Sequence, residues 1–297
     1  MRRLSRVLRA DAGRRTAEMA SRAATKSRVK SRVNWPLVAG LAFVGYGSAM
    51  VHAWDAGRTP LLDATPCEEA VYDAIEGKLP ADAVQRMKQG EVVVVDNVLS
   101  PTELKQAQRD IAQMDRERRF QPNTHHVPGI RTDEICYIRE SDVSGPKTGL
   151  RHVQRLIRGV PYELTRTGQW QEEPLVIAPW MQLARYEKDG GFYGPHTDAI
   201  EFLPVYWIAG PIALYSWLKS YAFRRRRITS IIYLNDPNWP EESGGALRAH
   251  HVNDDGYTDL LPKGGRLIMF DSRIVKHEVR PCHQARSALT AWICADL

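Results

Sequence analysis

A histidine and an aspartate separated by one residue, His196-Thr197-Asp198, are followed much later in the chain by an isolated histidine, His277. Two imidazoles and one carboxylate form the facial ligand set that holds Fe(II) and leaves positions on the ion open. Side chains two residues apart on a strand share a face, so His196 and Asp198 can converge on one ion. Because His277 is so distant in sequence, the fold must bring separate strands together, as a β-barrel does.

The residues around these histidines favour strands. Residues 190–195 are turn-rich and suit the entry of a strand at the rim of a barrel, while 266–270 and 287–293 have the composition of strands. Arg286 stands at the start of the last strand, and its guanidinium is a planar fork that matches a carboxylate. A lone H-x-D pair is as typical of a surface turn as it is of a metal site. The distal histidine, the arginine and the strands together favour a metal site.

Residues 91–297 resemble a known enzyme family over an ordered series of motifs. The motifs lie at 92–99, 130–138, 183–186, 231–235, 243–248 and 277–292. They are similar to those of the Fe(II)/2-oxoglutarate dioxygenases of prolyl 4-hydroxylase type, and more closely to those of the oxygen-sensing, HIF-type prolyl hydroxylases. The resemblance implies a mainly β fold of the α+β class, with a double-stranded β-helix (jelly-roll) core and flanking helices.

The resemblance also implies roles for single residues. The implied Fe(II) ligands are His196, Asp198 and His277. Arg286 would pair with the distal carboxylate of 2-oxoglutarate, whose other end would chelate the metal. Tyr186 matches a tyrosine that faces this cosubstrate, and Thr290 matches a hydroxyl that lines the pocket. Ascorbate is implied as a further cofactor.

One position departs from the HIF-type pattern. Those enzymes carry a tyrosine just before the strand tyrosine, where it helps to bind the distal carboxylate, and this chain has Ile232 there. We therefore expect the carboxylate pocket to depend more heavily on Arg286. For Trp292, which follows Arg286 on the same strand, we expect packing in the core.

The implied reaction is hydroxylation of a C–H bond by O₂, with conversion of 2-oxoglutarate to succinate and CO₂. The resemblance points to peptidyl proline as the substrate and to 4-hydroxylation. Two alternatives stay open. One is the same chemistry on a small molecule or a non-proline side chain, and the other is a non-catalytic, membrane-tethered binding module. The intact metal and arginine positions argue against the binding module.

Residues 1–34 form a basic tail. It carries eleven Arg or Lys against Asp11 and Glu18, which more than accounts for the net charge of +6 of the whole chain. Aromatic residues do not alternate with these charges as they do in many nucleic-acid-binding segments. We therefore expect no nucleic-acid partner.

Residues 35–54 contain no Asp, Glu, Lys or Arg, and Trp35 and Trp54 bracket them. About twenty such residues can span a bilayer core, so we expect a single transmembrane helix. The basic tail would stay cytosolic, which places the catalytic domain in the lumen of the endoplasmic reticulum or Golgi. Three glycines and His52 reduce the apolar character. The alternative is an organellar transit peptide that directs the chain to a mitochondrion or plastid.

Two further segments complete the expected organisation. Residues 55–90 form a mixed, helix-leaning connector ahead of the domain at 91–297. Within that domain, 202–227 is an apolar and aromatic insertion that ends in four arginines, in a place where the HIF-type enzymes are much shorter. The insertion could be a lid over the active site, an interfacial segment lying on lipid, or an ordinary insertion packed on the barrel. Its position makes it a candidate determinant of substrate choice.

Ser100-Pro101-Thr102-Glu103 predicts the start of a helix, with Ser100 as the N-cap, proline at the first position and Glu103 at the third. We expect this helix to run through Arg119. The four cysteines lack the C-x-x-C spacing of a metal site. Cys282 and Cys294 could pair in an oxidising lumen, or both could remain free thiols.

Overall fold

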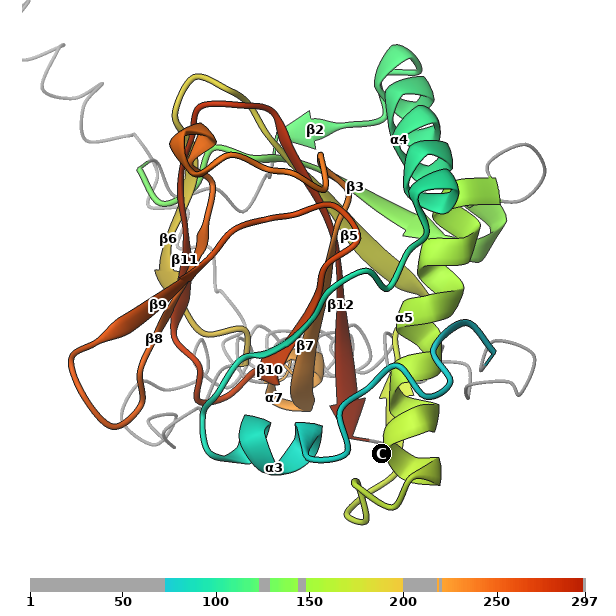
Figure 1. Cartoon of the computed structure of the whole chain (residues 1–297), viewed down its shortest axis with the longest axis vertical. Helices are drawn as coiled ribbons and strands as arrows, with labels where there is room; N and C mark the ends of the chain where they lie inside the picture. The colour runs from blue at the N-terminus through green and yellow to red at the C-terminus, as the bar shows by residue number, and fades with distance from the viewer. Residues whose placement is uncertain (1–72, 123–128, 144–147, 200–217, 219–220, 296–297) are drawn as a thin grey trace, which may run out of the picture. The chain divides into compact units, whose positions relative to one another are not determined.

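Two antiparallel β-sheets face each other in the computed structural model, and helices cover the outer side of the larger sheet (Figure 1). The structure describes residues 73–122, 129–143, 148–199, 218 and 221–295. Several expected features lie outside the described residues: the tail at 1–34, the span at 35–54, the connector up to residue 72, and residues 202–217 and 219–220 of the insertion. These features stay predictions.

The larger sheet contains eight strands. They are β1 (Val93–Val95), β2 (Gln121–Pro122), β3 (Glu134–Arg139), β4 (Leu175–Ile177), β5 (Trp180–Tyr186), β7 (Arg226–Tyr233), β10 (Leu267–Asp271) and β12 (Arg286–Ala295). Their order is β1-β10-β7-β12-β5-β3-β2, and β4 also pairs with β12. The opening strand predicted at 92–99 is therefore present in shortened form, as β1.

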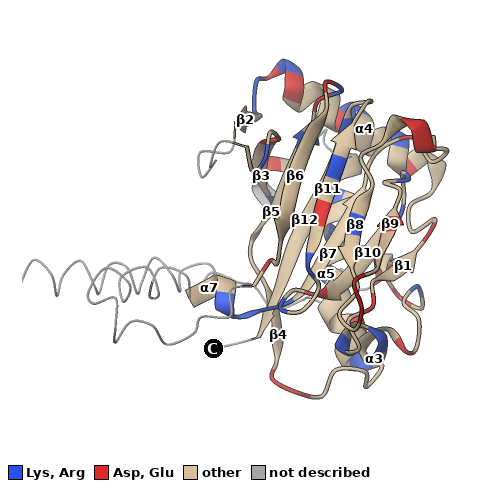
Figure 2. Ribbon diagram, turned by 90° about the vertical axis from the view of Figure 1, so that its left-hand side faces the viewer, with Lys and Arg blue, Asp and Glu red and all other residues tan. Residues whose placement is uncertain are grey.

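The smaller sheet contains four strands. They are β6 (Gly191–His196), β8 (Leu247–His250), β9 (Tyr257–Leu260) and β11 (His277–Cys282). The order is β6-β11-β8-β9, so strands that are distant in sequence lie side by side. Figure 2 looks onto this sheet, with the larger sheet behind it.

Helices pack against the larger sheet on the side away from the smaller one (Figure 1). They are α3 (Ala83–Lys88), α4 (Pro101–Arg116) and α5 (Thr148–Arg166). The short α7 (Tyr221–Arg224) lies elsewhere, at one end of the sheets just before β7 (Figure 1), and 3₁₀ turns occur at Glu140–Val143 and Glu241–Ser243. The amide of Leu150 in α5 donates a 2.9 Å hydrogen bond to the buried carboxylate of Asp110 in α4. This contact fixes the two long helices against each other.

The start of α4 confirms the predicted capping box. The backbone amide of Glu103 donates to the Ser100 hydroxyl at 3.3 Å, and the amide of Ser100 donates to the Glu103 carboxylate at 2.7 Å. The helix ends at Arg116 rather than at Arg119. It ends early because Arg118 adopts a positive φ of 55°, which no helical residue has.

Alternate residues of β7 face two different apolar cores. Ile228 and Ile232 pack with the helices, whereas Ile231 and Tyr233 lie in the core between the sheets. This alternation follows from the two-residue period of a strand. Each side of the larger sheet is therefore buried, and only the side between the sheets can contribute residues to an internal cavity.

The prediction of a mainly β domain with few helices is confirmed, and the two facing sheets are consistent with a jelly-roll core. Within the described ranges, no helix has both the length and the apolar character needed to cross a bilayer. Cys136, Cys282 and Cys294 are buried free thiols. The pairing of Cys282 with Cys294 that the sequence left open is therefore absent.

Candidate metal centre

The three predicted ligands come together between the two sheets. The ligand atoms of His196, Asp198 and His277 all lie within 4.8 Å of one another. Nε2 of His196 is 3.6 Å from one carboxylate oxygen of Asp198, and Nε2 of His277 is 3.7 Å from the other. An ion bonded to each ligand at about 2.1 Å can span such separations. The arrangement fits Fe(II), for which two histidines and one carboxylate are a recurring set.

Neighbouring strands hold the two histidines. His277, the first residue of β11, pairs with His196, the last residue of β6. The Nδ1 atoms lie 2.9 Å from the carbonyl of Gly194 and 3.2 Å from the carbonyl of Val275. A ring N–H that donates to a carbonyl fixes the tautomer, and it leaves Nε2 free to bind a metal. Both imidazoles are therefore oriented by their own backbone.

Asp198 reaches the centre by a different route from the one expected. Strand β6 ends at His196, so the strand alternation that was predicted to align the two side chains does not extend to Asp198. Tertiary hydrogen bonds place this residue instead. Thr229 donates from its hydroxyl to the Asp198 carboxylate at 2.7 Å, and Arg226 donates from Nη1 to the Asp198 backbone carbonyl at 3.0 Å. Both residues come from β7, so the larger sheet positions this carboxylate.

The charges at the centre suit metal binding at neutral pH. Burial by itself raises the pKa of Asp198, but the two imidazoles that face its carboxylate more than offset this effect, and the pKa lies well below its usual value. Burial lowers the pKa of His277 to about 4. The centre therefore holds an ionised carboxylate and a neutral imidazole in His277, which are the forms that bind metals.

A cavity of about 290 Å³ opens onto the centre and brings in the remaining predicted residues: Tyr186, Arg286 and Thr290 line it together with the three ligands. Arg286 is only 2% exposed, and its Nε donates to the Gly245 carbonyl at 2.9 Å. No carboxylate of the described residues pairs with its guanidinium. A buried guanidinium without a carboxylate partner is costly. The cavity is therefore suited to a ligand that brings its own carboxylate, as 2-oxoglutarate does.

The expectation for Ile232 is wrong, and the reason is the pleat of β7. Ile232 is fully buried in the core against the helices, on the opposite face from Arg286. The next residue, Tyr233, faces the site, and the Arg286 guanidinium lies 5.0 Å from the centre of its ring. The Tyr233 hydroxyl is buried and has no hydrogen-bond partner among the described residues. A carboxylate held by Arg286 is a suitable acceptor for this orphaned hydroxyl, so the pocket does not lack a tyrosine.

The expectation of core packing for Trp292 is also corrected. Its ring lines the cavity, and the guanidinium of Arg226 lies 3.8 Å from the ring centre. Sequence reasoning missed Arg226, Thr229 and Tyr233 as functional residues. A period-of-two reading of β7 through Tyr233 would have placed Thr229 and Tyr233 on one face. No local pattern indicated the contact between Arg226 and Asp198.

Comparison with known families agrees with this geometry. Residues 181–294 match the family described as the 2OG-Fe(II) oxygenase superfamily. This segment is a 2OG-Fe(II) oxygenase domain. It contains all three predicted iron ligands and Arg286, and its class is that of the 2-oxoglutarate-dependent dioxygenases.

Solved structures of prolyl hydroxylases share the fold. A prolyl-4-hydroxylase from Pseudomonas putida aligns with a TM-score of 0.54 at 22% identity, over 73% of this chain and 99% of that one. A Trichoplax adhaerens prolyl hydroxylase, solved with a hypoxia inducible factor peptide fragment, aligns with a TM-score of 0.55 at 22% identity, over 72% and 87%. At this level of identity the likeness concerns the fold.

Curated relatives match over a shorter stretch. Egl nine homolog 1 of rat and of human is 40% identical over 68 residues, which is 23% of this chain and 20% and 16% of those proteins. The matched stretch is thus about a fifth or less of their length. Together, the comparisons confirm the resemblance to 2-oxoglutarate dioxygenases of prolyl hydroxylase type that the motifs indicated.

Proposed function

We propose that the chain is an Fe(II)- and 2-oxoglutarate-dependent dioxygenase that hydroxylates peptidyl proline at C4. One observation carries the proposal. The metal triad and the buried Arg286 line the same cavity of about 290 Å³, so an iron site and a carboxylate site are within reach of one small ligand. Fe(II) and 2-oxoglutarate, when bound, would supply the chemistry by which O₂ gives one oxygen atom to a C–H bond and the other to succinate, with release of CO₂.

The protein's own residues orient these groups. His196, Asp198 and His277 would hold Fe(II), and their positions are fixed by backbone carbonyls and by the Thr229 hydroxyl. Arg286 would bind the distal carboxylate of 2-oxoglutarate, with the Tyr233 hydroxyl as a second donor. These contacts place the cosubstrate before the substrate binds, which lowers the entropic cost of reaching a reactive geometry.

The rest of the cavity controls access of water. Ile231, Leu247, Val279 and Ala288 contribute apolar wall, while Tyr186 and Thr290 are placed to face the cosubstrate. An apolar wall excludes water and strengthens the electrostatic contacts inside. We also propose that ascorbate supports turnover, as the resemblance implies.

The choice of proline rests on the similar proteins. Two of the solved structures that share the fold are described as prolyl hydroxylases, and one of them holds a peptide fragment. The mouth of the cavity can receive a chain segment, since Ile130, Tyr137 and Phe223 at its edge are 45%, 48% and 43% exposed. Exposed apolar side chains clustered at a pocket are typical of a binding surface.

The proposal is tested by incubating the full-length chain with Fe(II), ascorbate and labelled 2-oxoglutarate, with and without proline-rich peptides. We expect succinate to form faster with peptide and the peptide to gain hydroxyproline. If no succinate forms under any condition, the proposed dioxygenase activity is excluded. Succinate without peptide hydroxylation would instead favour a small molecule or another side chain as substrate. Arg248→Gln, which alters a half-buried arginine that is paired with Asp259 on the β8–β9 hairpin and does not line the cavity, is the control variant.

For localisation, we propose that residues 35–54 anchor the chain in the endoplasmic reticulum or Golgi membrane, with the catalytic domain in the lumen. The absence of charge in this segment and the basic tail before it support the proposal. Imaging of a C-terminally tagged full-length chain, combined with protease protection of the tag in isolated membranes, tests it. A tag found in mitochondria or plastids on a shortened chain would show a cleaved transit peptide.

A further inference from the structure

A second cavity, of about 410 Å³, adjoins the cavity of about 290 Å³ at the metal centre, which we call the iron cavity. We call it the outer cleft and define it by Tyr137, Arg139, Trp180, Phe223, Arg226 and Trp292. Four of these residues, Tyr137, Phe223, Arg226 and Trp292, also line the iron cavity. The two cavities therefore share a wall, and a substrate whose reacting carbon lies at the metal can extend into the outer cleft.

The outer cleft carries positive charge that forms no ion pair with the carboxylates of the described residues. Its lining includes Arg139 and Arg226 but, among the described residues, no Asp or Glu. Arg226 lies over the rings of Phe223 and Trp292, at 4.1 and 3.8 Å, and Arg139 lies 5.8 Å from the centre of the Trp180 ring. Neither guanidinium forms an ion pair with a described carboxylate. A cationic, aromatic cleft of this kind is complementary to an anion.

The carboxylate of Asp142 is near Arg139 but bonds to other groups. Asp142 accepts a 2.8 Å hydrogen bond from the Arg139 backbone amide and pairs with Arg119 at 3.0 Å. Among the described residues, no carboxylate is left to pair with the guanidinium of Arg139. Arg139 lies on β3 and is exposed. A ligand that pairs with its guanidinium would therefore lie at the open side of the cleft.

One buried donor at the cleft also lacks a partner. The indole N–H of Trp292 is inaccessible to solvent and has no hydrogen-bond acceptor in the part of the chain that the structure describes. Because this N–H is closed to solvent, a ligand in the outer cleft would contact the Trp292 ring and the Arg226 guanidinium that lies 3.8 Å from its centre, and not the N–H.

We propose that the outer cleft binds an acidic side chain of the peptide substrate, a few residues from the proline that is hydroxylated. The inference rests on the proposed function, because it assigns part of the same substrate.

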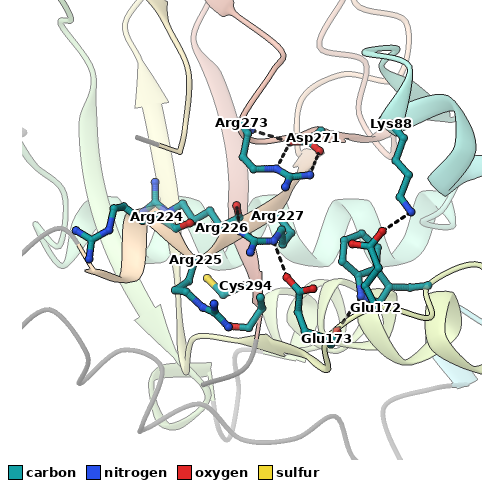
Figure 3. Close-up of polar contacts among 12 residues, drawn as sticks. Lys88, Glu172, Glu173, Arg224, Arg225, Arg226, Arg227, Asp271, Arg273 and Cys294 are labelled. Atoms are coloured by element: carbon teal, nitrogen blue, oxygen red, sulfur yellow. Dashed lines mark hydrogen bonds and ion pairs between the residues drawn. The ribbon is translucent and has the colours of Figure 1, made fainter. Parts of the chain in front are cut away.

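Phe223 and Arg226 lie at the end of the predicted insertion at 202–227. Figure 3 shows Arg226 next to Arg227, which is committed to Glu173. Arg226 also bonds to the backbone of Asp198, so it links the cleft to the metal centre.

The test uses the full-length chain with Fe(II), 2-oxoglutarate and a nonapeptide library that has a central proline and random residues elsewhere. Hydroxylated products are sequenced by mass spectrometry. The measured quantity is the ratio of Asp and Glu to Asn and Gln at each position among products, relative to the input library. This ratio is internal to each sample and does not depend on overall turnover. A charge-assisted contact at a partly exposed site predicts an enrichment of roughly fivefold.

Variants separate a specific role of the outer cleft from a general charge effect. Arg139→Gln should lose most of the enrichment, and Arg139→Lys should retain part of it. Arg116→Gln removes an equally exposed arginine from α4, away from the cleft, and should leave both the enrichment and the turnover unchanged. Because Arg139 is exposed, its substitution is not expected to prevent folding.

Each outcome decides the matter. Enrichment at one side of proline that falls in Arg139→Gln but not in Arg116→Gln supports the inference. Hydroxylated peptides without acidic enrichment, or with enrichment that Arg139→Gln leaves intact, overturn it while the proposed function stands. Succinate without hydroxylated peptide, or no succinate at all, overturns the proposed function and this inference with it.

Discussion

His277 lies directly opposite His196 in the ladder between β6 and β11, and the centres of their imidazole rings are 4.3 Å apart. The pairing of the smaller sheet therefore defines one half of the metal centre. The other half comes from the larger sheet, through the hydrogen bond from Thr229 to Asp198. A metal that binds all three ligands ties the two sheets together, so metal binding should stabilise the fold.

Thr229→Val should weaken metal binding and also cost about 1–3 kcal/mol of stability, because the buried Ser272 hydroxyl lies 2.8 Å from the Thr229 hydroxyl and would lose this hydrogen-bond partner. The substitution keeps the shape of the side chain and removes the hydroxyl that orients the Asp198 carboxylate. Loss of such a supporting hydrogen bond costs about 10- to 100-fold in metal affinity. Equilibrium dialysis against Fe(II) without oxygen measures the change. Ser230→Ala is the matched control, because the Ser230 hydroxyl is buried, points to the other face and has no partner. Equal affinities in the two variants would contradict the role of Thr229.

Tyr233→Phe should have opposite effects on stability and on cosubstrate binding. Without ligand, removal of a buried hydroxyl that lacks a partner should raise the free energy of unfolding by about 1 kcal/mol. Binding of 2-oxoglutarate should become weaker, because the hydroxyl is then absent as a donor. Chemical denaturation and calorimetry measure the two effects. Ile232→Val, on the opposite face of β7, should cost about 1 kcal/mol of stability and leave 2-oxoglutarate affinity unchanged. If Ile232→Val changed that affinity, the assignment of faces would be refuted.

Arg286→Ala should abolish 2-oxoglutarate binding and spare Fe(II). The guanidinium is the buried cation of the cavity, and removing one partner of a buried ion pair costs about 3–5 kcal/mol, which corresponds to at least about 100-fold in affinity. Anaerobic titration calorimetry measures the cosubstrate, and metal analysis after dialysis measures iron. Unchanged cosubstrate affinity in Arg286→Ala would exclude the proposed role. Arg248→Ala, which removes an arginine that pairs with Asp259 and does not line the cavity, should bind 2-oxoglutarate as the parent chain does.

Acid should destabilise the metal-free protein in a defined window. Burial lowers the pKa of His277 from 6.5 to about 4. Between these pH values the unfolded chain binds a proton that the folded chain does not, so the free energy of unfolding falls as pH falls. The expected slope from this residue is about 1.4 kcal/mol per pH unit. Urea denaturation in the presence of a chelator, from pH 7 to pH 4, measures it. The slope should be smaller in His277→Gln, and equal slopes would rule out the neutral form of His277.

The sequence determined those features of the protein that depend on residue type and local spacing. His196, Asp198, His277 and Arg286 could be named because metals and carboxylates require particular donor groups, and few alternatives fit their order in the chain. The capping box of Ser100 could also be predicted from the sequence, because its two bonding partners are only three residues apart. The end of α4 was not, because it depends on the left-handed backbone of Arg118.

Only the tertiary structure decided which groups face the centre and what holds them. Asp198 lies beyond the end of its strand and is placed by β7, a contact between distant segments that no local period contains. The choice between Ile232 and Tyr233 depended on the face of β7 that is turned toward the smaller sheet, and a shift of one residue reverses that choice. Residue identity fixed the chemistry available to this chain, and packing of the two sheets fixed which side chains can take part in it.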